Sequence, residues 1–106
     1  KNIMTNIKHF YDSLYFANVK LQIGGQRDSK LSCWVQREED QKDHTVTYIV
    51  YMENKDDFYG LLHECLHLVK LVFIDRQIPF VSENDEAIAY YLCWWFKTLW
   101  RVSHKT

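Results

Sequence analysis

Between Phe58 and Val72 apolar residues recur three and four positions apart, and this spacing constrains the fold more than any other feature of the chain. On an α-helix, such residues gather along one stripe. His63 and His67 fall on the opposite side of the same helix. The segment therefore predicts a helix that buries one face against a core and presents two imidazoles on the other face. The stripe consists of Phe58, Leu61, Leu62, Cys65, Leu68, Val69 and Val72.

The segments before this helix predict an α+β fold. Apolar residues at helical spacing from Ile3 to Asn18 predict an amphipathic N-terminal helix. Three later segments alternate between apolar and polar residues and predict a small, three-stranded, mostly antiparallel sheet. The later half of the third segment is apolar on both faces, which favours a more central position for it in the sheet. The three segments are Val19 to Ile23, Leu31 to Arg37 and Thr45 to Met52.

Two helices complete the expected architecture. The helix that carries the histidines should run to about Asp75, because Pro79 blocks its continuation. Ser82-Glu83-Asn84-Asp85 has the pattern of a capping box and predicts a final helix that runs to about Val102. Residues 1–106 are therefore expected to form a single domain, which is an ordinary length for one core.

Composition limits the classes of partner and compartment. The formal net charge is −1, with acids and bases interspersed, so no nucleic acid or anionic membrane partner is expected. No secretory signal is visible, and the longest uncharged apolar run, Ala87 to Phe96, is too short to cross a bilayer. The three cysteines are odd in number and lack CxxC spacing, which favours free thiols. A cytoplasmic location is expected.

The sequence His63-Glu64-Cys65-Leu66-His67 carries the clearest chemical signal. Two histidines four residues apart on a helix converge on one metal ion, and Zn²⁺ commonly accepts such ligands. Glu64 is then placed to take a proton from a metal-bound water. The alternative is an ordinary amphipathic helix with two histidines and a glutamate facing solvent. Cys65 turns to the opposite face and is expected in the core.

A catalytic zinc site needs a third protein ligand, for which a carboxylate is a common choice. The first turn of the final helix offers Glu83 and Glu86. Glu86 is preferred because it is aligned with Tyr90, and Glu83 is the second candidate. The alternative is that both acids only complement the helix dipole. Gly60, one turn before His63, is expected to leave room for a ligand.

These two motifs together resemble those of the gluzincin zinc metallopeptidases. The HExxH helix is followed by Asp85-Glu86-Ala87-Ile88-Ala89, which is similar to the glutamate helix of that family. The short chain is similar to the minigluzincins and to small HExxH proteins of phages and mobile elements. The glutamate helix loosely resembles that of the ImmA/IrrE-type peptidases.

The resemblance implies His63, His67 and Glu86 as zinc ligands and Glu64 as general base. It also implies an edge strand that aligns an extended substrate, for which Leu31 to Arg37 is the expected segment. The chain departs from the family one turn after Glu86, where an acid is common and Tyr90 stands. The group that stabilises the tetrahedral intermediate is not defined, with Tyr90, Tyr91 and His104 as candidates.

Two functions follow as hypotheses. The first is a small zinc-dependent endopeptidase that acts on a peptide or protein. The second is a catalytically inactive protein on the same scaffold that forms a homodimer or binds a protein partner through its aromatic last helix. The alternative for that helix is simple burial of its apolar face. The face consists of Ile88, Tyr91, Leu92, Trp95 and Leu99, with Trp94, Phe96 and Trp100 beside it.

Overall fold

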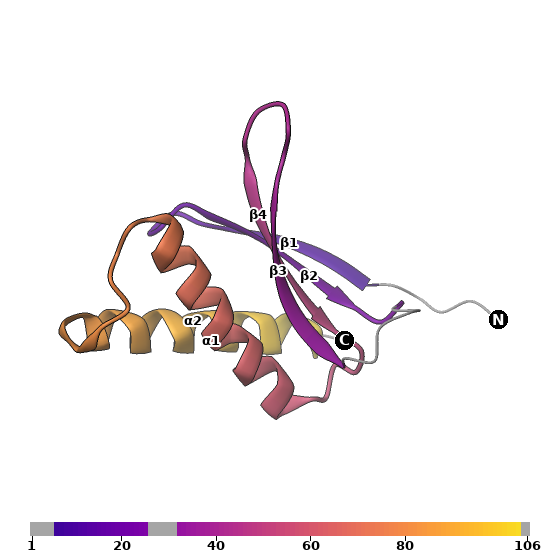
Figure 1. The fold of residues 1–106 in the computed structure, drawn as a ribbon. Coiled ribbons are helices and arrows are strands. Elements are labelled where there is room, and N and C mark those ends of the chain that lie inside the picture. Colours follow the sequence, from indigo (N-terminus) through magenta and orange to yellow (C-terminus); the bar gives the residue numbers. More distant parts are fainter. Residues whose placement is uncertain (1–5, 26–31, 105–106) are drawn as a thin grey trace.

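The computed structural model describes residues 6–25 and 32–104, which form one mixed sheet and two long helices (Figure 1). The strands lie in the order β1-β2-β4-β3. Antiparallel pairs β1–β2 and β3–β4 flank a parallel pair, β2–β4. In chain order the elements are β1 (Asn6–Asp12), β2 (Ala17–Ile23), β3 (Cys33–Glu39), β4 (Val46–Met52), α1 (Phe58–Asp75), the 3₁₀ turn η1 (Ser82–Asn84) and α2 (Asp85–Ser103).

The N-terminal segment corrects the expected fold. Residues 6–12 pair with β2 as a strand, so the helix expected from Ile3 to Asn18 is wrong, and the sheet is four-stranded and mixed. Residues 3–5 of that expectation lie outside the described residues. Asp12 accepts hydrogen bonds from the main-chain N–H groups of Leu14 (2.9 Å) and Tyr15 (3.1 Å), which closes a turn. Pairing with β2 therefore outweighs the helical spacing of this segment.

The later elements agree more closely with the sequence. β2, β3 and β4 lie at the three expected strand segments, although Leu31 of the second segment lies outside the described residues. β4 is central and β3 is at an edge. α1 ends at Asp75 and α2 at Ser103, as expected. The caps differ. Asp57 caps α1 by accepting from the Gly60 N–H at 2.9 Å, whereas η1 and α2 have no side-chain cap hydrogen bond, so the capping box is wrong.

A single apolar cluster joins the sheet to both helices. Val19, Leu21 and Val50 contribute to it from the two central strands, and Trp95 of α2 is fully buried in it. On α1 most of the predicted stripe is buried, including Cys65, although Phe58 and Leu62 at its margin are 44% and 38% exposed. Neither helix described here is long and apolar enough to cross a membrane.

Arg76, just after α1, holds the turn between β1 and β2. Its Nε donates to the carbonyl of Tyr15 at 2.6 Å and its Nη2 to the carbonyl of Phe16 at 2.7 Å. Tyr15 in turn packs against Phe73 of α1 and Tyr91 of α2. One guanidinium therefore fixes the hairpin at the point where both helices meet it.

We expect Arg76→Met to lower the free energy of unfolding by about 1–3 kcal/mol, because two carbonyl oxygens lose a charged donor. Chemical denaturation monitored by circular dichroism measures the change. Arg101→Met is the matched control, since Arg101 is exposed on α2, and its effect should stay within about 0.5 kcal/mol. Equal losses in the two variants would contradict the role given to Arg76.

Candidate functional site

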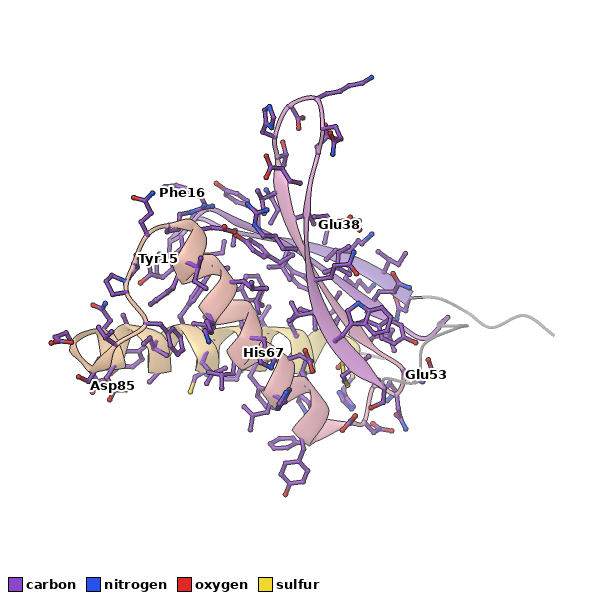
Figure 2. All side chains as sticks on the ribbon, in the orientation of Figure 1. Tyr15, Phe16, Glu38, Glu53, His67 and Asp85 are labelled. Carbon is purple, nitrogen blue, oxygen red and sulfur yellow. The ribbon has the colours of Figure 1, made fainter. Side chains whose placement is uncertain are left out.

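His63 and His67 lie on the exposed side of α1 and face each other. Their Nε2 atoms are 3.1 Å apart, and the ring centroids are separated by 4.7 Å. A tetrahedral zinc ion with Zn–N bonds of about 2.0–2.1 Å separates two ligand nitrogens by about 3.3 Å. The spacing of the two imidazoles therefore fits two ligand positions of one zinc ion. Figure 2 shows His67 near the middle of α1.

Glu64 lies between these histidines in sequence but is turned toward the sheet. It is only 8% exposed, and the main chain of Val35 on β3 hydrogen-bonds its carboxylate. Burial raises the pKa of the Glu64 carboxyl, against the opposing effects of the two imidazoles and of Val35. A carboxylate with a raised pKa is a stronger proton acceptor near neutral pH. The local geometry thus gives Glu64 the properties of a base.

A groove of about 550 Å³ runs between α1 and the edge strand β3. Glu64 and His67 line it, so the candidate base and one imidazole open into the same space. In the described part of the chain β3 pairs only with β4, which leaves its other backbone edge without a strand partner. The remaining lining residues are Cys33, Trp34, Val35, Lys70, Leu71 and Ile74.

Asp75, at the last turn of α1, ties β3 and β4 to the helix. Arg37 donates from Nε to its carboxylate at 2.8 Å, and the hydroxyl of Tyr48 donates to the same oxygen. Burial raises the pKa of the Asp75 carboxyl, but the hydrogen bonds from Arg37 and Tyr48 outweigh this effect and hold the pKa below its ordinary value. The Asp75 carboxylate therefore stays ionised near neutral pH and links the end of α1 to β3 and β4.

Cys33, which lines the groove from β3, lies next to Asp57 and Gly60. The Cys33 thiol donates to Asp57 Oδ2 at 3.3 Å, and burial together with this acid raises the pKa of Cys33 to about 12. The thiol therefore stays protonated at neutral pH and is a poor metal ligand. A Cβ atom on Gly60 would lie 2.6 Å from Cys33 Sγ and 2.3 Å from Asp57 Oδ2. The close approach of these two side chains, rather than space for a ligand, explains this glycine.

The predicted third ligand is not beside the histidine pair. Glu86 is exposed in the first turn of α2, and Glu83 is exposed in η1. Within residues 6–25 and 32–104, no group of three or more His, Cys, Asp or Glu side chains is placed to hold one metal ion. Figure 2 shows Asp85, which begins α2, at the far end of the molecule from His67. The residues present thus fit two positions of a zinc site, and Glu86 stays a prediction that this geometry does not support.

The three candidates for stabilising a tetrahedral intermediate are also elsewhere. Tyr90 and Tyr91 line a different cavity, next to the β1–β2 turn. The imidazole of His104 is within 2.8 Å of Asp56 Oδ1. None of the three lines the groove beside Glu64. The β3 residues of the groove fall within the edge strand expected from the sequence, Leu31 to Arg37, whereas Leu71 was given no role there. Leu71 lies four residues after His67, a spacing that places it on the same helix face.

Comparisons of the chain with protein-family models, with curated proteins and with solved structures found no match.

We expect Asp75→Asn to lower the free energy of unfolding at pH 6. We also expect this free energy to fall less steeply in the variant as the pH is lowered from 6 to 2.5. A carboxylate whose pKa is lowered by folding stabilises the fold above its unfolded pKa, near 3.8. That contribution is lost as the pH falls through the lower, folded value. Urea unfolding of the wild type and the variant between pH 6 and 2.5 measures it. Glu38→Gln, an exposed acid on β3, should leave the acid dependence close to that of the wild type.

Proposed function

We propose that this chain is a small zinc-dependent peptidase. The observation that carries the proposal is the meeting of Glu64 and His67 in a groove beside the open edge of β3, with His63 at ligand distance from His67. An edge strand next to a hydrolytic helix offers main-chain hydrogen bonds to an extended peptide. The HExxH sequence supports the same reaction class.

The roles of the residues follow from their positions. His63 and His67 would hold the ion, which when bound supplies polarisation of the scissile carbonyl and acidification of a water. Glu64 would accept a proton from the attacking water and donate it to the leaving amine. The main chain of Val35 orients the Glu64 carboxylate, and the burial of Glu64 keeps the proton affinity of that carboxylate high. β3 aligns the substrate backbone along the groove.

In the proposed zinc site His63 and His67 would be two donors, and the resemblance implies Glu86 as the third. Glu86 would reach the pair only after movement of the first turn of α2. Zinc titrations of the wild type, His67→Ala and Glu86→Ala test this arrangement. We expect one equivalent of zinc in the wild type and at least a tenfold loss of affinity in His67→Ala, because a chelate of two imidazoles becomes a single contact. His44→Ala, an exposed loop histidine, is the control and should bind as the wild type does.

Cleavage of a mixed peptide library by the zinc-loaded protein tests the chemistry. We expect Glu64→Gln to retain zinc and to lose at least about 100-fold in rate, as for removal of a general base. Glu38→Gln is again the control. Cleavage that survives Glu64→Gln would disprove the assignment, and zinc binding that survives loss of both His63 and His67 would disprove the site.

The second candidate function is a catalytically inactive binding protein. It is favoured by the separation of Glu83 and Glu86 from the histidine pair. Trp95 and Leu99 are fully buried, so neither side chain is available to a partner, as expected if the helix simply buries its apolar face. The large hydrophobic side chains of α2 that stay exposed are Tyr90 and Trp94, at 74% and 47%. Zinc binding without any peptide cleavage would favour this candidate.

A further inference from the structure

A cavity lined by aromatic side chains lies apart from the groove beside Glu64. It lies between the β1–β2 turn and the first turns of α2, and its volume is about 640 Å³. In Figure 2, Tyr15 marks the turn and Asp85 the start of α2. The two cavities share no lining residue. A cavity of this size suits a small molecule.

Five aromatic rings and one carboxylate give this cavity its chemistry. Tyr91 is almost fully buried, and its hydroxyl donates to Asp12 Oδ2 at 2.6 Å. Tyr11, Tyr90 and Trp94 remain between 47% and 74% exposed, so their rings are available to a ligand. The rings and the carboxylate belong to Tyr11, Tyr15, Tyr90, Tyr91, Trp94 and Asp12.

The charge of the cavity is one-sided. Asp12 is the sole charged residue among those that line it, and no basic side chain does. Glu86 lies one helical turn before Tyr90 on the same side of α2 and adds a second exposed acid at its border. Arg76 is bonded to the carbonyls of Tyr15 and Phe16 and does not line the space. Aromatic faces carry negative potential, so rings and acids act in the same direction.

We propose that this cavity binds a small organic cation, specifically a quaternary ammonium group of the size of choline. Such a group has a soft positive charge and an apolar surface. It therefore gains from both the aromatic rings and the carboxylate field, without having to displace the hydrogen bonds that Asp12 already accepts.

Choline and 3,3-dimethylbutan-1-ol are the probes, because the alcohol has the same shape without the charge. Titration of ¹⁵N-labelled protein in ¹H–¹⁵N spectra reports binding at each amide. We expect saturable shifts at Leu14 and Ala87, which line the cavity, and an affinity for choline at least tenfold above that for the alcohol. An affinity for the alcohol within tenfold of choline would overturn the proposal, since the cavity would then be merely apolar.

Three variants locate the site on the molecule. Trp94→Ala and Tyr90→Ala should each weaken choline binding at least tenfold. Tyr90 is highly exposed, so its variant keeps the test valid if the loss of Trp94 disturbs the fold. Tyr59→Ala is the matched control, because Tyr59 is 80% exposed on α1 and does not line the cavity. Choline binding unchanged in Tyr90→Ala, or weakened equally in Tyr59→Ala, would refute the assignment.

Discussion

The structure depends on how α1 is packed between two different environments. One side of this helix supplies Leu61, Leu68 and Val72 to the core, and these side chains are fully buried. The opposite side exposes His63 and His67. Glu64 lies at the boundary, where β3 meets the helix, and so becomes buried next to a strand backbone. The proximity of the candidate base to an open strand edge thus follows directly from the burial of the apolar stripe.

The sequence predicted this part of the molecule well because the signals were local. The stripe on α1, the central position of β4 and the edge position of β3 all follow from periodicity within one segment. The first strand was missed because the spacing of its apolar residues does not show its pairing with β2 or the contact of Asp12 with Tyr91. Asp12 ends the strand through its turn and also accepts from Tyr91, a residue far along the chain. Helical spacing over 3–18 contains no information about either contact.

The candidate third ligand shows the same limit. The first turn of α2 attracts acids through the helix dipole, whether or not a metal is nearby. The position of this turn relative to His67 depends on residues 76–81, which connect α1 to η1, and on the packing of Tyr91 and Trp95. The spacing of the two motifs specifies neither. Gly60 is a related case. A missing side chain next to His63 suggested space for a ligand, yet the contacts of Cys33 and Asp57 account for it.

The parallel pairing of β2 with β4 also determines how the sheet is assembled. β1–β2 and β3–β4 are antiparallel hairpins whose strands are neighbours in the chain, whereas the central pair joins Val19 to Tyr48. Local hairpins close at a smaller entropic cost than a distant pair. The sheet is therefore best described as two local hairpins joined by one parallel pair. The Arg76 contact is a second long-range link, because it joins the turn of the first hairpin to the end of α1, which follows the second hairpin in the chain.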